Sequence, residues 1–239
     1  MDERVRGRLR TAVAAIRRSR RHHDWARQVC AACRDAVPGI DSAALVLYDA
    51  NRSMDLLGVS DAFAELIEDT QVVVGEGPGW TAFSTGATAM VEDLEAEGER
   101  WPVFVPEAAR LGIGAMFVFP LQVGGIRLGV LDLYRRRPGA LSTRSTTDAA
   151  LLAALISYAL IEEAAAVNDG AVTGLDIPPL ATTRRDINVA TGMIAAQMGI
   201  AIDEAFVRLR AFAFAAERPL LDVARDVLER RVNLDGAAE

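Results

Sequence analysis

The sequence contains no lysine, so all 26 of its Lys and Arg positions are arginine. Only two cysteines and two histidines occur among 239 residues, which argues against a disulfide scaffold. No apolar run approaches the ~20 residues that a membrane span needs. The charged N-terminus MDERVRGRLR lacks the apolar region of a signal peptide. We therefore expect a cytoplasmic protein that does not enter a membrane.

The two cysteines have the C-x-x-C spacing of redox and zinc sites, at Cys30 and Cys33. A closed zinc site needs about four ligands, and the only histidines are His22 and His23. Residues three apart on a helix share a face, and buried thiols are common in cores. We expect both cysteines to pack in the core. No nucleophile or acid–base pair accompanies the histidines, so we expect no metal, no cofactor and no enzymatic activity.

The overall charge gives no general attraction to nucleic acid, since the formal net charge is −7. Residues 1–36 differ, with ten arginines against four acidic residues and apolar positions at helical spacing. This segment is predicted to be helical and to pack on the domain that follows. A basic arm of this kind could contact nucleic acid, but a solvated helix face is the more common outcome.

The middle of the chain has the pattern of an α+β domain with an antiparallel sheet flanked by helices. Gly124-Gly125 is a two-residue loop suited to a tight hairpin. Val72-Val73-Val74 is a further short β-branched piece, and residues 151–166 form an alanine- and leucine-rich helix. The predicted strands are 42–48, 54–59, 114–121 and 126–134.

A glycine-rich loop, Gly75-Glu76-Gly77-Pro78-Gly79, leads into Trp80. It lacks the lysine and the serine or threonine of a phosphate-binding Walker loop, and it does not fit a dinucleotide-binding loop. Because proline favours the first position of a helix, we interpret the loop as a tight turn into a helix that begins near Pro78. Its helix N-terminus could still receive an anionic ligand group.

Residues 168–183 contain two glycines, two prolines and polar residues, which indicates a linker. Residues 184–235 then show three short amphipathic helices. The second is predicted to bury a stripe of Ile202, Phe206, Leu209, Ala213 and Ala216, and the third to bury Leu220, Ala224 and Val227. Gly199 is placed for a left-handed cap, Ala201 occupies the next helix's cap position, and Pro219 the start of the third helix. Gly192 lies inside the first helix, where close approach of another helix or of an RNA backbone would explain it.

Residues 25–167 resemble the GAF family of small-molecule sensors. The resemblance is carried by Gly75-Glu76-Gly77-Pro78, Val91-Glu92-Asp93-Leu94, Trp101-Pro102 with Phe104, and the segments 119–121 and 129–134. It implies a pocket between the sheet and its helices for an unidentified small molecule. The cyclic-nucleotide signature, the chromophore cysteine and a haem histidine are not visible. By this resemblance the pocket residues are Trp80, Phe83, Trp101, Phe104, Met116 and Tyr134, although each could simply fill the core.

Residues 184–235 resemble the ANTAR family of RNA-binding antitermination modules. The matching positions are 190–194, Gly199, 204–206, 209–210, Leu220, Val223 and Ala224. The resemblance implies a homodimer that binds structured leader RNA hairpins through Arg184, Arg185, Thr191, Arg208, Arg210 and Arg218. Eight arginines face nine acidic residues in 184–239, a net charge of −1, so phosphate binding requires clustered arginines. The alternative is that these helices mediate dimerisation or protein docking without RNA, with Phe214 on a contact surface. Under both readings we expect dimerisation through the first helix and residues 151–166.

Overall fold

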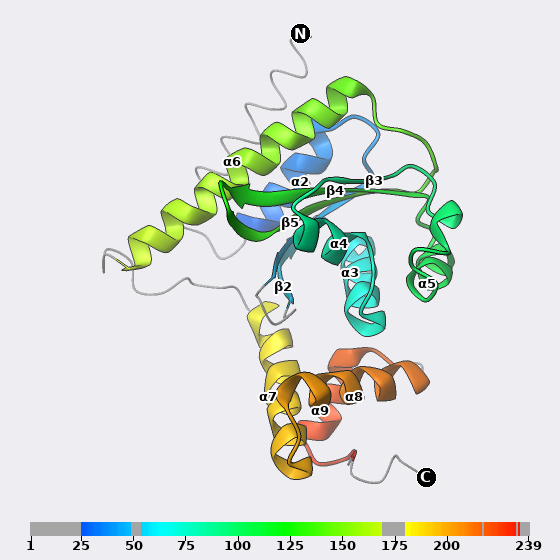
Figure 1. The fold of residues 1–239 in the computed structure, drawn as a ribbon, viewed down its shortest axis with the longest axis vertical. Coiled ribbons are helices and arrows are strands. Elements are labelled where there is room, and N and C mark those ends of the chain that lie inside the picture. The colour runs from blue at the N-terminus through cyan, green and yellow to red at the C-terminus, as the bar shows by residue number, and fades with distance from the viewer. Residues whose placement is uncertain (1–24, 49–53, 169–179, 217, 233, 235–239) are drawn as a thin grey trace.

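The computed structural model describes residues 25–48, 54–168, 180–216, 218–232 and 234, with side chains left out at 163–168 and 180–185. The expected helix before residue 25 therefore lies outside the described residues. The chain forms a sheet with helices on both faces, followed by a separate group of three helices (Figure 1). Both predicted parts of the fold, the α+β domain and the all-α domain, are confirmed.

The sheet has five strands in the order β2-β1-β5-β4-β3, and all neighbouring strands are antiparallel. β4 and β5 are joined by Gly124-Gly125, with Val123 paired to Ile126 and Gly124 at φ +58°. The positive φ explains why glycine stands there, and it confirms the predicted hairpin. The strands are β1 Ser42–Tyr48, β2 Met54–Val59, β3 Ala89–Val91, β4 Ala115–Val123 and β5 Ile126–Arg135.

The alternation of side chains along the strands divides the core into two layers. On β5, Leu131 and Leu133 face one layer, and Val130 and Tyr134 face the other. The first layer is covered by α2 and α6, and the second by α3, α4 and α5 (Figure 1). The helices are α2 Trp25–Ala36, α3 Ala62–Val74, α4 Pro78–Thr85, the short 3₁₀ helix η1 Glu95–Glu97, α5 Phe104–Leu111 and α6 Thr143–Asn168.

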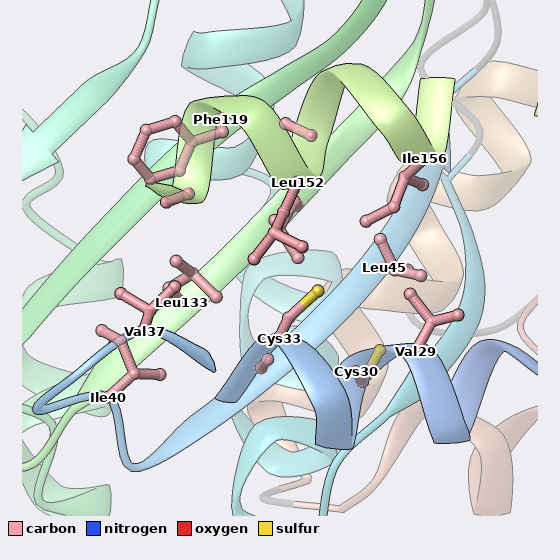
Figure 2. Close-up of a cluster of buried hydrophobic side chains, with 14 of the residues drawn as sticks. Val29, Cys30, Cys33, Val37, Ile40, Leu45, Phe119, Leu133, Leu152 and Ile156 are labelled. Carbon is pink, nitrogen blue, oxygen red and sulfur yellow. The ribbon is translucent and has the colours of Figure 1, made fainter. Parts of the chain in front are cut away.

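Both cysteines lie in the first layer, between α2 and the sheet (Figure 2). Cys30 and Cys33 are wholly buried, and the Cys30 thiol donates a hydrogen bond to the carbonyl of Gly58 at 3.2 Å. Burial raises the pKa of Cys33 to about 12, so its thiol stays protonated at neutral pH. The expectation that the cysteines pack in the core is confirmed.

Helix α6 contains the predicted helix 151–166 and begins eight residues earlier, at Thr143. Its segment Thr143–Glu162 has the length and mean hydropathy, 1.2, of a membrane-spanning helix, although no uninterrupted apolar run is long enough. In this structure α6 packs along the sheet, with Leu152 and Ile156 wholly buried in the first layer (Figure 2). A core helix with one apolar face accounts for this composition.

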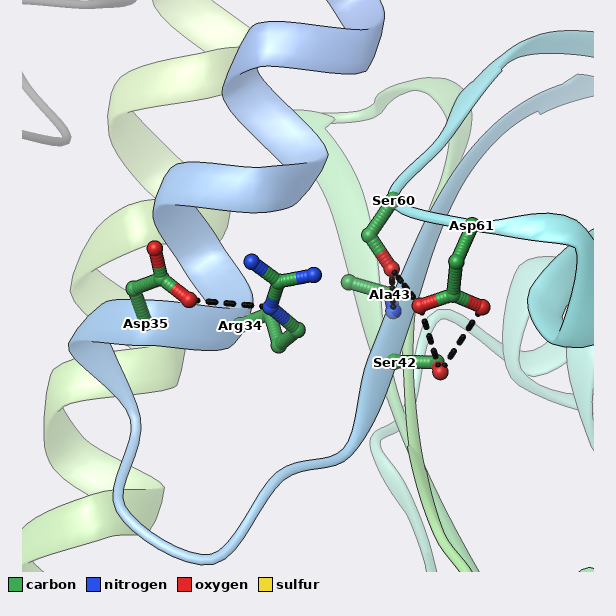
Figure 3. A network of polar contacts seen from close by, with 6 residues as sticks. All are labelled: Arg34, Asp35, Ser42, Ala43, Ser60 and Asp61. Atoms are coloured by element: carbon green, nitrogen blue, oxygen red, sulfur yellow. Dashed lines mark hydrogen bonds and ion pairs between the residues drawn. The ribbon is translucent and has the colours of Figure 1, made fainter.

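The start of α3 is fixed by hydrogen bonds to its N-cap residue, Asp61 (Figure 3). Its carboxylate accepts from the backbone N–H of Ala64 at 3.1 Å and from the hydroxyls of Ser42 and Ser60 at 2.8 Å. Burial acts to raise the pKa of Asp61, but these hydrogen bonds outweigh burial and lower the pKa below its usual value. The cap joins α3 to β1 and sets where the following helical turns lie.

The β-branched residues Val72–Val74 form the last turn of α3. The helix ends after Val74, with Gly75 as its C-cap at φ +73°. The short extended piece suggested by their β propensity is therefore absent. Three features favour the helix: the N-cap at Asp61, the left-handed Gly75 at its end, and packing along its length. Together they outweigh the β propensity of three valines.

The C-terminal helices are α7 Leu180–Met198, α8 Ile202–Ala215 and α9 Leu220–Leu228. α7 begins four residues before the boundary expected at residue 184. Gly199 has φ +64°, and Ala201 caps α8 without a side-chain hydrogen bond, both as predicted. Pro219 occupies the N-cap of α9.

The buried stripe of α8 is rotated from the predicted one. Ala205, Leu209 and Ala213 are wholly buried, whereas Ile202 is 69% exposed and Ala216 is exposed. The sequence pattern favoured the larger side chains, but the helices approach closely through small ones. In α9 the predicted buried face is confirmed, with Val223 added to it.

Candidate functional site

The second layer of the sensor domain holds the residues predicted to line a pocket. Trp101, Phe104, Met116 and Tyr134 are buried in it, and Phe83 packs against its edge. The Trp101 indole N–H donates to the hydroxyl of Thr81 at 3.3 Å. The structure brings these side chains to one face of the sheet, and ligand binding by them stays a prediction.

An aromatic cluster lies at the edge of this layer and was only partly predicted. Tyr48 stacks on Phe83 with ring centroids 4.9 Å apart, and its edge meets Trp80 at 5.6 Å. All three rings are partly exposed. Aromatic rings that are buried on one side and exposed on the other are typical of small-molecule sites.

The glycine-rich loop between α3 and α4 joins three helices. One carboxylate oxygen of Glu76 accepts from the backbone N–H groups of Val103 at 2.6 Å and Phe104 at 2.9 Å, where α5 begins. Pro78 is the first residue of α4. The loop therefore makes the tight turn into a helix that we expected, and its acidic side chain caps a neighbouring helix.

Next to this loop lies a buried polar cluster that was not predicted from the sequence. Tyr134 of β5 donates its hydroxyl hydrogen to one oxygen of Glu68, and Gln71 donates to the other at 3.2 Å. The side-chain carbonyl of Gln71 accepts from the backbone N–H of Gly79 at 3.0 Å. Glu68 and Tyr134 are wholly buried, so the cluster links α3, α4 and β5 inside the sensor domain.

A second carboxyl group, that of Asp132, belongs to the same cluster. Asp132 is wholly buried on β5, and its carboxyl group shares a hydrogen bond with the carboxyl group of Glu68. Burial, together with the nearby negative charge of Glu68, raises the pKa of Asp132 well above its usual value. One signal was available in the sequence, because Asp132 is a charged residue at an inward position of an apolar strand.

Asp132→Asn is expected to stabilise the protein at neutral pH. Because the folded-state pKa is raised, the folded protein holds this proton more tightly than the unfolded chain, and stability falls as pH rises from about 4. The groups facing the carboxyl are Glu68 of α3 and Tyr134 of β5, and burial also raises the pKa of Tyr134. Urea unfolding at pH 5 and pH 8 measures the effect. A gain for the variant that is larger at pH 8 supports the raised pKa, and equal differences at both pH values contradict it.

The C-terminal helices contact the sensor domain through the end of α3. Val72 and Val73 pack against the buried cluster of the three helices. The guanidinium group of Arg210 on α8 fills the space where a Cβ on Gly75 would be, and it lies 5.5 Å from the ring of Phe206. α7 also approaches β2. α3 therefore contacts both domains: Glu68 packs inside the sensor domain, and Val72 and Val73 pack against the C-terminal helices.

The arginines predicted to bind RNA do not form one cluster. Positions two apart on a helix point in directions that differ by about 200°, so Arg208 and Arg210 lie on opposite sides of α8. Arg208 pairs with Glu204 at 3.0 Å, and Arg218 pairs with Asp226 at 2.6 Å. The side chains of Arg184 and Arg185 lie outside the described residues.

Thr191 and Gly192 occupy different environments on α7. Thr191 is buried and donates its hydroxyl hydrogen to the carbonyl of Ile187 at 2.7 Å. In this structure its side chain packs within the helical domain, and RNA binding by Thr191 stays a prediction. A Cβ added at Gly192 would meet no described atom within 4 Å. Close approach of another described helix of this chain therefore does not explain this glycine.

Comparison with known protein families finds a match for each of the two parts of the chain. Residues 19–160 match the family model of the GAF domain, and residues 181–228 match that of the ANTAR domain. No curated protein matches the sequence.

Similar solved structures show the fold of the first part. The GAF domain of a phosphoenolpyruvate-protein phosphotransferase from Acinetobacter is 20% identical with a TM-score of 0.53, covering 74% of this chain and 100% of that one. That of the Coxiella burnetii enzyme is 16% identical with a TM-score of 0.53, covering 70% and 97%. The free methionine-R-sulfoxide reductase of Neisseria meningitidis is 17% identical with a TM-score of 0.53, covering 70% and 96%. The chain therefore belongs to the GAF-domain family and carries an ANTAR domain after its GAF domain.

Proposed function

We propose that the protein is a signal-responsive transcription antitermination regulator, in which the GAF domain senses a small molecule or partner and the ANTAR domain binds structured RNA. A GAF domain followed by an ANTAR domain fits a sensor-regulated antitermination regulator in general. In this proposal the protein is cytoplasmic and not an enzyme. The observation that carries the proposal furthest is the contact between the two domains, because a sensor must be physically linked to its output.

The contact provides a route from signal to RNA. α3 holds Glu68 inside the sensor domain, and about one turn later its valines pack on the ANTAR helices. In this structure the guanidinium of Arg210 lies against Gly75, so it is directed toward the sensor domain. Docking and RNA binding by Arg210 therefore compete, and a signal that moves α3 shifts the balance between them.

Among the predicted RNA-binding arginines whose side chains the structure describes, Arg208 is placed to meet an RNA phosphate in the docked state. Its side chain is 41% exposed, and its ion pair is to exposed Glu204 in the same helix. Exposed pairs of this kind contribute little, so Arg208 can exchange Glu204 for a phosphate oxygen at small cost.

Arg208→Glu is expected to weaken binding to hairpin-containing leader RNA roughly tenfold, because a charge-assisted contact is replaced by repulsion. Gel shifts over a salt series measure the loss, and the slope of log affinity against log salt should fall by about one. The matched control is Arg110→Glu, which makes the same charge change on α5 of the sensor domain, where Arg110 is exposed. Equal losses in both variants, or no RNA binding by the wild type at low salt, would count against the proposal.

A second candidate function is supported by an exposed apolar residue on α8. Phe214 is 49% exposed, and Val207, also exposed, lies two turns earlier on the same side of the helix. Such a surface is typical of a contact between proteins. In this alternative the ANTAR helices mediate dimerisation or protein docking without binding RNA.

Both candidates predict a dimer that forms through α6, where Tyr158 is 58% exposed and Leu151 is exposed two turns earlier. Tyr158→Glu is then expected to give monomers in light scattering. Phe214→Glu is expected to leave the dimer intact in the antitermination proposal, and a weakened dimer in this variant supports the second candidate. A wild-type monomer contradicts dimerisation in both.

A further inference from the structure

Two arginines of the ANTAR domain share one carboxylate of α9. Arg218 contacts one oxygen of Asp226 at 2.6 Å, and Arg231 contacts the other oxygen at 3.1 Å. The Asp226 side chain is only 14% exposed, whereas those of Arg218 and Arg231 are 40% and 63% exposed. A largely covered carboxylate therefore holds two guanidinium groups side by side, and both remain open to solvent.

The charges at this end of α9 do not cancel. Glu229 also pairs with Arg231, and no described residue forms an ion pair with Arg230, which lies between them in the sequence. Three arginines (Arg218, Arg230 and Arg231) against two acidic residues leave one net positive charge. Like charges held this close repel each other, and an anion bound between them relieves the repulsion.

Arg230 adopts a backbone conformation that is unfavourable for a residue with a side chain. Its φ is +57°, and it is the only non-glycine residue with a positive φ in the described part of the chain. It follows Glu229, the C-cap of α9, and the N–H of Arg231 donates to the carbonyl of Asp226 at 2.7 Å, as in a Schellman cap. Glycine is the usual residue in this conformation, and α3, α4 and α5 all end with one. A strained residue in place of glycine indicates that its side chain has a use.

We propose that Arg218, Arg230 and Arg231 form a binding site for the phosphate groups of an RNA backbone. The proposal rests on the RNA binding proposed above and adds two residues to it, since only Arg218 was predicted from the sequence. Planar guanidinium groups bind phosphate oxygens through two parallel hydrogen bonds. Because Asp226 already holds two of these groups in place, they lose little further freedom when a phosphate binds.

The site stays open while the ANTAR domain is docked on the sensor domain. α9 packs on α7 and α8, and the segment that follows α9 lies on the side of the ANTAR domain away from the sensor domain (Figure 1). Arg210, in contrast, is directed toward the sensor domain at Gly75. The docked protein therefore keeps phosphate contacts at the end of α9, and undocking adds Arg210 to them.

Gel shifts of full-length protein with hairpin-containing leader RNA, over a salt series, test the site. The double variant Arg218→Gln and Arg231→Gln removes two charges and keeps long polar side chains. We expect its affinity to fall at least tenfold, and the slope of log affinity against log salt to fall by about 1.5. The matched control is Arg100→Gln with Arg110→Gln, the same change at two exposed positions of the sensor domain, and it is expected to bind as the wild type does.

Arg230→Gly separates phosphate binding from a role in folding. Glycine relieves the strain at this position, so we expect the melting temperature to stay the same or rise. RNA affinity is expected to fall severalfold, because one phosphate contact is lost. A lower melting temperature together with unchanged RNA affinity would show that Arg230 only stabilises the end of α9, and would remove it from the site.

Inorganic tripolyphosphate is a second probe, because it offers phosphate groups without RNA. It is expected to raise the melting temperature of the wild type by several degrees and to leave that of the double variant unchanged; an equal rise in both proteins would overturn the site.

The RNA measurements separate the site from the proposed function. Equal RNA binding by the wild type and the double variant, with a loss in Arg208→Glu measured in parallel, overturns the site and leaves the proposed function standing. A wild type that responds to tripolyphosphate but binds no leader RNA contradicts both RNA as the ligand and the proposed function.

Discussion

Full-length protein with Val72→Asn and Val73→Asn is expected to bind leader RNA more tightly than the wild type, by a factor on the order of ten. The two valines pack on the ANTAR core from the sensor side, so asparagine would place polar amides in an apolar contact. Loss of this contact releases Arg210 from Gly75 and raises the fraction of molecules that can bind RNA. Because both changes lie in the GAF domain, the RNA-binding surface itself is unaltered.

Fluorescence anisotropy titrations at one salt concentration measure the change. The matched control is Leu66→Asn, which places the same side chain on α3 at an exposed position. We expect the control to bind RNA as the wild type does. Unchanged or weaker binding by the double variant, with its circular dichroism spectrum intact, would show that the contact does not restrain the ANTAR domain.

Gly129→Ala is expected to destabilise the GAF domain by about 4 kcal/mol or more, which is a large part of the stability of a typical domain. Gly129 lies on β5 opposite Leu47 of β1. An added Cβ would overlap the carbonyl oxygen of Val46 and lie 2.8 Å from the Cα of Leu47, and both atoms belong to backbone. Backbone in the centre of a sheet cannot move aside without breaking strand pairing.

Urea unfolding followed by circular dichroism measures this loss. Gly125→Ala is the control, because it makes the same change in the hairpin loop where a Cβ meets no described atom within 4 Å. We expect the control to stay within roughly 0.5 kcal/mol of the wild type. An unfolding midpoint for Gly129→Ala equal to that of the control would refute the close approach of β1 and β5.

Four of the five strands were predictable because they carry strong local signals, whereas the short β3, Ala89–Val91, was not predicted. Alternating and β-branched residues mark the strands, and Gly124-Gly125 marks the turn between β4 and β5. α3 was not predicted, since Val72–Val74 favour an extended chain while the cap at Asp61 and contacts on both sides impose a helix. The secondary-structure propensity of a short segment is overridden where capping and tertiary packing act on the same residues.

The candidate sites were less predictable, because they depend on residues that folding brings together. Glu68 and Asp132 lie far apart in sequence, and only the packing of α3 on β5 makes them a pair. Arg208 and Arg210 are nearly adjacent in sequence, yet the turn of the helix directs them to different surfaces. Some candidate site residues could be predicted from the sequence, but which residues lie next to them could be seen only in the structure.

RNA binding in cells is the most direct test of the proposed regulator. Ultraviolet crosslinking of the full-length protein, followed by sequencing of the bound RNA, should recover a limited set of hairpin-forming leader transcripts. Recovery should fall in Arg208→Glu and persist in Arg110→Glu. Recovery of RNA that is no richer in hairpins than the total transcript pool, and equal for all three proteins, would contradict RNA recognition by the ANTAR domain.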